Sequence, residues 1–189
     1  AAMQRYLSDS AIAAATKAAN AVHGEHEHME AERRFVTTFF TDIVGFTPMT
    51  ESMEAEALVT LLNEYFDTMT PFFKENGGII DKFIGDCIMA VFGAPYPQDD
   101  HAVRAVQVAL DMRQRLHELN TERGGSAPIQ MRMGIHSGRA VSGPIGSEKR
   151  REFTVLGDTV NIASRIESMV AKKGQIVIVE GYMDAIIAH

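Results

Sequence analysis

Apolar and polar positions follow two different periods along this chain, and together they predict a structure of mixed helices and strands. Short β-branched and aromatic runs bounded by glycine or polar residues indicate strands. The predicted strands cover residues 34–41, 79–84, 87–92, 129–141, 152–156 and 175–179. Apolar residues that recur every three or four positions indicate helices. The predicted helices cover residues 52–75, 99–120, 159–171 and 182–187.

The order of these elements is β-α-β-β-α-β followed by further elements, which is typical of the ferredoxin-like, split β-α-β arrangement. We therefore expect an α+β fold, with an antiparallel sheet and helices on one face. Only Gly85 and Asp86 separate the second strand from the third, which predicts a tight hairpin. Pro71 is expected to break or kink the first of these helices near its end.

The first part of the chain has a different pattern from the rest. Residues 4–22 are rich in alanine and predict a helix with a narrow apolar face, which suits pairing with a similar helix. The charged segment that follows contains His23, His26 and His28, for which a solvated linker is favoured over a metal site. We therefore divide the chain into an N-terminal helix and linker over residues 1–32 and a compact domain over residues 33–189.

The net charge, the single cysteine and the length of the apolar runs restrict the classes of protein to which this chain can belong. The chain has 189 residues, of which 46% are hydrophobic, and a net charge of −7. No basic face is evident, so we expect no nucleic-acid partner. The single cysteine, Cys87, lies in an apolar run and is interpreted as a small buried residue, not a nucleophile. No apolar run approaches the roughly 18 residues that span a bilayer. The expectation is a cytoplasmic domain, whose parent protein could be attached to a membrane.

Two aspartates are candidate metal ligands. Asp42 ends the first predicted strand and Asp86 lies in the predicted hairpin turn, and these segments are neighbours in a split β-α-β sheet. Two adjacent carboxylates repel each other unless cations hold them, and Mg²⁺ binds carboxylate and phosphate oxygens. The alternative is structural: Asp42 would cap the following turn, and Asp86 would be an ordinary turn residue.

Other polar residues are candidates for substrate contacts. Lys82 lies on an apolar strand face, either as a donor to a ligand or with its ammonium group reaching the sheet edge. Asn161 and Arg165 lie four apart on one helix face, which suits either phosphate binding or solvation. His136 is interpreted as a packed strand histidine. No Walker A sequence and no order of residues typical of covalent catalysis is present.

Four segments resemble motifs of the class III adenylyl and guanylyl cyclase family, in the family's order: FTDIVGFT, KFIGDCIMAVFG, MRMGIHSGRAVSGPIG and FTVLGDTVNIASRIE. The resemblance extends from about Arg33 to about Met183. It implies an adenylate cyclase that converts ATP to cyclic AMP and pyrophosphate with two Mg²⁺ or Mn²⁺ ions. It also implies a homodimer with active sites at the interface, and an upstream sensor domain in the parent protein.

The resemblance assigns roles to the residues around the first motif. Asp42 and Asp86 would bind both metal ions, and the carbonyl of Ile43 would assist. Ile43, Gly45 and Phe46 would also contact the substrate, because the turn that they form can offer backbone N–H groups to phosphate oxygens.

The remaining motifs supply the other roles. Lys82 and Thr154 would read the base, and Asn161 would position the ribose. Arg165 would neutralise the reacting phosphate. Arg132 would reach the triphosphate from the subunit that binds the metals, while the other subunit supplies the base pocket.

The two base-reading residues favour ATP over GTP. Adenine presents an acceptor at N1 and a donor at its amino group, which Lys82 and Thr154 can match. Guanine presents the reverse pattern, and guanylyl cyclases of this family have glutamate at the position of Lys82. Many adenylyl cyclases have aspartate at the position of Thr154. Threonine at this position resembles the variant in bacterial enzymes that respond to bicarbonate.

One departure from the family leaves alternatives open. Family members continue through more strands after the segment QIVIVEGYMDAIIAH, including a lysine that contacts phosphate. We therefore expect a catalytic domain that is short at its C-terminus. The alternatives are a non-catalytic module for nucleotide binding or dimerisation, and a guanylate cyclase.

Overall fold

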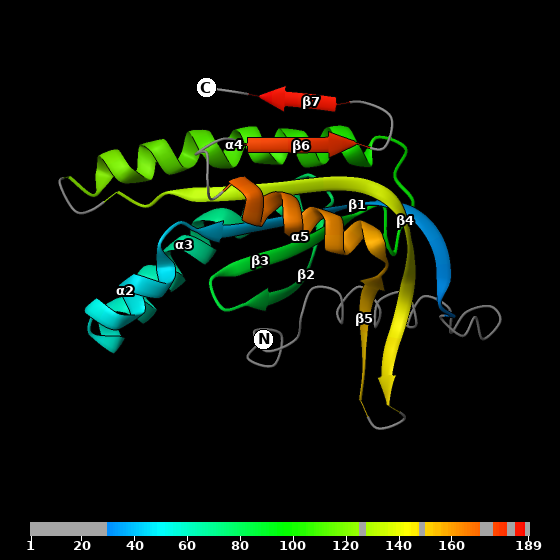
Figure 1. Cartoon of the computed structure of the whole chain (residues 1–189), viewed down its shortest axis with the longest axis horizontal. Helices are drawn as coiled ribbons and strands as arrows, with labels where there is room; N and C mark the ends of the chain where they lie inside the picture. The colour runs from blue at the N-terminus through cyan, green and yellow to red at the C-terminus, as the bar shows by residue number, and fades with distance from the viewer. Residues whose placement is uncertain (1–29, 125–127, 148–149, 171–175, 181–183, 188–189) are drawn as a thin grey trace.

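The structure is a computed structural model that describes residues 30–124, 128–147, 150–170, 176–180 and 184–187. The predicted N-terminal helix and its histidines lie outside these ranges. Strands and helices alternate along the described chain (Figure 1). The strands are β1 (Glu32–Ile43), β2 (Ile79–Ile84), β3 (Cys87–Phe92), β4 (Met131–Ser147), β5 (Arg150–Leu156), β6 (Ile176–Glu180) and β7 (Asp184–Ile187). The helices are α2 (Phe46–Ser52), α3 (Ala55–Glu75), α4 (His101–Glu122) and α5 (Asp158–Val170).

The strands form one sheet in the order β2-β3-β1-β4-β6-β7, and β5 also pairs with β4. All neighbouring strands are antiparallel except β4 and β6, which are parallel. The order β4-β1-β3-β2 within this sheet is that of a split β-α-β core, so the predicted fold class is confirmed. The β2–β3 hairpin with Gly85 and Asp86 at its turn is also confirmed, since Ile84 pairs with Cys87.

Strand β1 is buried on both faces because its aromatic residues alternate between two cores. Phe39 belongs to a core with α3 and α4. Its neighbour Phe40 points to the other face, where it packs with Val155 and Ala163. The six consecutive residues Val36–Thr41 are all buried, threonines included, as expected for a strand whose sheet is covered on both faces.

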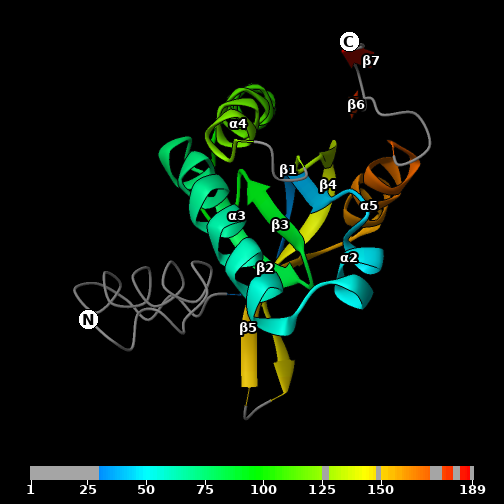
Figure 2. The ribbon, with the colours of Figure 1, turned by 90° about the vertical axis from the view of Figure 1, so that its left-hand side faces the viewer.

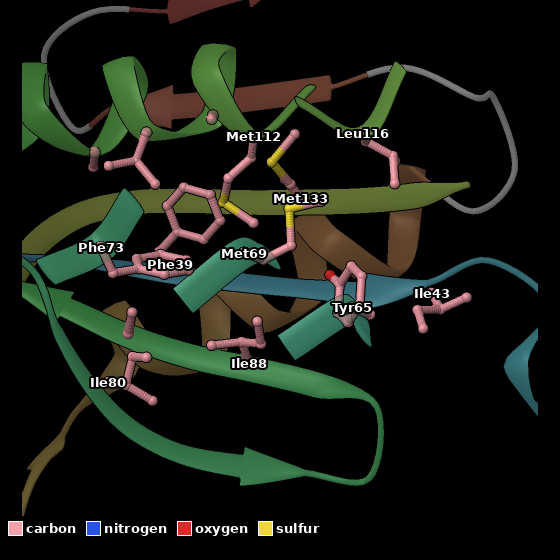
Figure 3. Close-up of a cluster of buried hydrophobic side chains, with 14 of the residues drawn as sticks. Phe39, Ile43, Tyr65, Met69, Phe73, Ile80, Ile88, Met112, Leu116 and Met133 are labelled. Atoms are coloured by element: carbon pink, nitrogen blue, oxygen red, sulfur yellow. The ribbon is translucent and has the colours of Figure 1, made fainter. Parts of the chain in front are cut away.

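The larger core lies between the sheet and helices α3 and α4. Helix α3 contributes residues spaced four apart, so that they share one face: Leu61, Tyr65, Met69 and Phe73. Figure 3 shows Tyr65, Met69 and Phe73 beside Phe39 and Met133 of the sheet and Met112 of α4. Pro71 lies inside α3, which continues to Glu75, so the expected break at this proline is wrong.

Two other expectations need correction. Helix α5 lies on the opposite face of the sheet from α3 and α4, as the two views show (Figures 1 and 2), whereas we expected all helices on one face. The reason is the alternation along β1 and β4, which gives the sheet a second apolar face for α5 to cover. Residues 182–187 were expected to form a helix, but Asp184–Ile187 form strand β7, paired with β6.

Gly134 on β4 allows α5 to approach the sheet closely. A Cβ atom at this position would collide with the backbone of Ala163 and of Glu167 in α5. Its φ is not positive, so the backbone itself would accept alanine and the constraint is steric. This close approach determines how near the side chains of α5 lie to the end of β1.

We predict that Gly134→Ala destabilises the protein by about 1–3 kcal/mol, because the added methyl must push α5 away from β4. The measurement is chemical denaturation. Arg139→Ala, at an exposed position of the same strand, is the control and should change stability by less than about 0.5 kcal/mol. Equal stability of the two variants would contradict the steric role of Gly134.

Candidate active site

The ends of β1 and of the β2–β3 hairpin bring Asp42 and Asp86 to the same place. The backbone N–H of Ile43 donates a hydrogen bond to Asp86 Oδ2 at 2.9 Å, so this carboxylate lies against the residue next to Asp42. Burial raises the pKa of Asp86, and the negative charge of Asp42 raises it further, while the Ile43 hydrogen bond opposes both. The two carboxylates therefore lie close enough to repel each other, as expected for a pair that binds cations.

A partly buried ion network holds Asp42 in the structure. Arg132 is its partner in the β1–β4 register and donates from Nη2 to Asp42 Oδ2 at 2.7 Å. The other face of this guanidinium contacts the carboxylate of Glu167, from α5, which is 5% exposed. The side chain of Arg132 thus lies between two carboxylates, one from β1 and one from α5.

The donor set fits a divalent cation. Asp42 Oδ1 is buried and has no hydrogen-bond partner in the structure, which leaves a carboxylate oxygen available at the site. Within the described ranges, no group of three or more His, Cys, Asp and Glu side chains could enclose a metal ion by itself. Mg²⁺ typically binds one or two protein carboxylates and takes its remaining ligands from water and substrate phosphates. Asp42 and Asp86, with the carbonyl of Ile43, would hold such an ion.

The turn after Asp42 has the backbone form that the glycine requires. Gly45 has a φ of 75°, in the left-handed region that favours glycine, and α2 begins at the next residue, Phe46. Phe46 packs partly against the larger core, which anchors this turn beside the two carboxylates. Contacts of Ile43, Gly45 and Phe46 with substrate phosphates remain a prediction.

The structure brings the two predicted base-reading residues together through a third residue. Thr154 on β5 donates a hydrogen bond from Oγ1 to Asp81 Oδ2 at 2.8 Å. Lys82 Nζ lies 3.4 Å from the same oxygen. The ladder between β2 and β3 shifts register between Ile80 and Lys82, which indicates a bulge at Asp81. A bulge redirects side chains, so Asp81 and Lys82 can both face Thr154.

Asn161 and Arg165 are both exposed on α5, whereas their neighbours Ile166 and Glu167 are buried. The two residues therefore lie on one accessible face of the helix, as their spacing predicts. They are not part of the ion network around Asp42. Their roles, and that of Arg132 toward a triphosphate, remain predictions; in this structure Arg132 contacts Asp42 and Glu167.

Two residues at these sites were missed by sequence reasoning. Glu167 follows Arg165 in the segment ASRIE and reads as one more polar position of an amphipathic helix. Asp81 precedes Lys82 in the segment IIDKFI, where a charged residue inside an apolar strand was the available signal. Their importance depends on burial and on distant partners.

Comparison with known proteins identifies the family of this chain. Residues 29–186 match the family described as the adenylate and guanylate cyclase catalytic domain. The chain belongs to this family and is a nucleotidyl cyclase catalytic domain.

Relatives and solved structures agree with this assignment. The chain is 39% identical over 153 residues to adenylate cyclase 1 of Rhizobium meliloti (strain 1021), covering 80% of this chain and 23% of that protein. It is similar in fold to the adenylyl cyclase CyaB from P. aeruginosa, with a TM-score of 0.74, 41% identity and 79% of each chain covered. It is equally similar to the guanylyl cyclase Cya2, with a TM-score of 0.73, 42% identity and coverage of 79% and 77%.

The chain spans about a quarter of the length of two curated relatives, 23% of the Rhizobium meliloti protein and 29% of an adenylate cyclase of Anabaena cylindrica. Within the described ranges, no helix combines the length and apolar character needed to cross a membrane.

We predict that Cys87 is unreactive in the folded protein. Burial raises its pKa from 9.0 to about 12, and the nearby charge of Asp42 adds to this shift. At pH 8 the thiolate fraction then falls roughly 1000-fold relative to an unperturbed thiol. Iodoacetamide labelling of this single cysteine should be slow in the native protein and fast in denaturant.

The pH dependence gives a second check on Cys87. Because its pKa is raised, labelling of the native protein should keep rising about ten-fold per pH unit from pH 8 to pH 10. The denatured protein should instead level off near pH 9. The structure has Cys87 half-buried, not fully buried as expected from the sequence. Native labelling that levels off at the same pH would contradict its assignment as a non-nucleophilic residue.

Proposed function

We propose that this domain is an adenylate cyclase that converts ATP to 3′,5′-cyclic AMP and pyrophosphate. The observation that carries the proposal is the carboxylate pair of Asp42 and Asp86, with a buried oxygen of Asp42 that lacks a partner. This pair lies beside a glycine turn, as a site for metal-bound phosphates requires. The relatives named as adenylate cyclases support the same reaction.

The reaction is an in-line displacement at the α-phosphorus of ATP. The ribose 3′-oxygen gives up its proton, which ends on the pyrophosphate or in the solvent, and forms a bond to phosphorus, while the bond to the bridging oxygen breaks and pyrophosphate leaves. Two Mg²⁺ or Mn²⁺ ions, when bound, supply the Lewis acidity that lowers the pKa of the 3′-hydroxyl and neutralises phosphate charge. Positioning and charge neutralisation by the protein account for the rest of the acceleration.

The protein side chains have separate tasks in this reaction. Asn161 holds the ribose so that its 3′-oxygen lies in line with the leaving group. Arg165 stabilises the negative charge that develops on the α-phosphoryl group. Arg132 binds the triphosphate, and for this its guanidinium must exchange the oxygen of Asp42 for a phosphate oxygen while Glu167 keeps its other side in place.

A homodimer explains why these tasks are divided between two surfaces. The carboxylate pair lies at the end of β1, whereas Asn161 and Arg165 are exposed on α5. A second copy of the chain can bring its own α5 to the carboxylate pair of the first. Two-fold pairing then forms two equivalent sites, each with residues from both subunits.

ATP is the proposed substrate because of Lys82 and Thr154. A guanylate cyclase is the second candidate, since the identity to the guanylyl cyclase Cya2 is 42%. The amino group of Lys82 donates hydrogen bonds only, which suits the N1 acceptor of adenine and conflicts with the N1 donor of guanine. Mispaired polar groups in such a pocket discriminate by as much as about 10⁴–10⁵.

We predict cyclic AMP from ATP with Mn²⁺ or Mg²⁺, and much less cyclic GMP from GTP. Asp42→Ala should lower kcat at least about 1000-fold, because it removes a metal ligand. Asp67→Ala, which removes an exposed carboxylate of α3, is the matched control and should retain full activity. The assay is quantification of cyclic nucleotides with each substrate offered separately.

Three results would contradict the proposal. A preference for GTP would favour the guanylate cyclase. Nucleotide binding without any cyclic product would favour the non-catalytic module. Full activity of Asp42→Ala would remove the metal site from the mechanism.

We predict that two inactive variants complement each other when mixed. Asp42→Ala and Arg165→Ala damage opposite halves of the site, so a mixed dimer retains one intact site. After equilibration in equal amounts, activity should recover to about a quarter of that of the wild type, since half of the dimers are mixed and each has one of two sites. The control mixture, Asp42→Ala with Asp86→Ala, should stay inactive. Recovery in neither mixture would contradict sites shared between subunits.

A further inference from the structure

Asp81 is a buried acid that the proposed reaction does not use directly. It lies on β2, at the bulge, and is 6% exposed. A buried carboxylate costs free energy unless it is paired and hydrogen-bonded. Its oxygen Oδ2 has two partners, the hydroxyl of Thr154 at 2.8 Å and the ammonium of Lys82 at 3.4 Å. These are the two residues that the proposed function assigns to the base.

The direction of the hydrogen bond between Thr154 and Asp81 follows from chemistry. Burial raises the pKa of Asp81, while the hydrogen bond from Thr154 and the ammonium of Lys82 oppose that shift. The ionised carboxylate can only accept hydrogen bonds, and the geometry has Thr154 Oγ1 as the donor to Asp81 Oδ2. Thr154 must therefore donate its single hydroxyl hydrogen to Asp81. The lone pairs of the Thr154 oxygen are then available only as acceptors toward any other group.

We propose that Asp81 is the specificity-determining residue that makes Thr154 an acceptor, so that the pocket selects an adenine base with its amino donor. This inference rests on the proposed function, and it extends the readout of the base from two residues to three. A free threonine hydroxyl can rotate and donate, and a donating Thr154 would satisfy O6 of guanine. Asp81 excludes that orientation by holding the hydrogen.

Asp81 acts through the hydroxyl of Thr154, and the surroundings support this indirect role. The space around Asp81 is small and is lined by Ile79, Val91, Ala94, Phe153 and Val155. Asp81 thus contacts the two predicted base-reading side chains and is otherwise surrounded by apolar neighbours. Within the described ranges, the hydroxyl of Thr154 makes no other hydrogen bond.

The test compares ATP and GTP within each variant, so that a loss of folded protein cancels in the ratio. Asp81→Ala removes the acceptor and should lower the ratio of kcat/KM for ATP over GTP by about 10- to 100-fold. Asp81→Leu fills the same space without an acceptor, and should give the same loss if the alanine variant does not fold. Asp67→Ala removes an exposed carboxylate of α3, away from Thr154 in the sequence, and is the matched control, with an unchanged ratio.

Two further variants separate the hydrogen bond from the charge. Asp81→Asn keeps one acceptor oxygen in the side-chain amide. The positively charged ammonium of Lys82 favours the amide orientation that places this oxygen at the position of Oδ2. Thr154 therefore still donates its hydrogen to residue 81. This variant should retain the wild-type ratio to within about three-fold. In the background of Thr154→Val, Asp81→Ala should change the ratio by less than about three-fold, because the hydroxyl that it orients is gone.

Binding of 3′-deoxy-ATP and 3′-deoxy-GTP, which cannot cyclise, distinguishes failure of the inference from failure of the proposed function. The wild-type domain should prefer the adenine analogue, and Asp81→Ala should lose that preference. A wild type without preference for adenine would overturn both proposals. A wild type that prefers adenine, together with an unchanged ratio in Asp81→Ala and Asp81→Leu, would overturn this inference alone. A loss in Asp81→Asn as large as in Asp81→Ala would also overturn it.

Discussion

The pairing of β1 with β4 is the constraint on which the rest of the structure depends. Twelve residues of β1 are in register with β4, from Glu32 opposite Ser142 to Ile43 opposite Met131. Because the side-chain period of a strand is two, a slip by one residue would exchange the core of α3 and α4 with the core of α5. The burial of Phe39 and Phe40 in different cores makes such a slip costly. The same register places Asp42 opposite Arg132.

The charged groups at the end of this strand pair are stabilised by neighbouring opposite charges. The half-buried Asp42 and Arg132 and the buried Glu167 form a series of opposite charges, and the carboxylate of Asp86 accepts a backbone hydrogen bond beside them. Removing one partner of a buried ion pair costs about 3–5 kcal/mol, because the other charge is left uncompensated. Such an arrangement is poor for stability alone, and it suits a site that must exchange Arg132 for cations and phosphates.

The sequence predicted where candidate site residues lie when their placement depends on local order along the chain. Asp42 at a strand end, Asp86 at a two-residue turn and the shared face of Asn161 and Arg165 all follow from patterns within a few residues. The contributions of Asp81 and Glu167 did not follow. Thr154 and Asp81 are 73 residues apart, and their contact depends on a bulge that no periodicity reveals. The side of the sheet that α5 covers was also mispredicted, since an amphipathic helix fits either face equally well.

The sequence by itself determined the order of elements, the hairpin between β2 and β3, and the family motifs, because these depend on side-chain periodicity and on turn residues. The tertiary structure alone decided which buried acids have partners, because burial and hydrogen bonding join segments distant in the chain. It also decided that Asp42 Oδ1 is left without a partner while Asp81 Oδ2 has two. That difference separates a carboxylate available to a cation from one committed to orienting its neighbours.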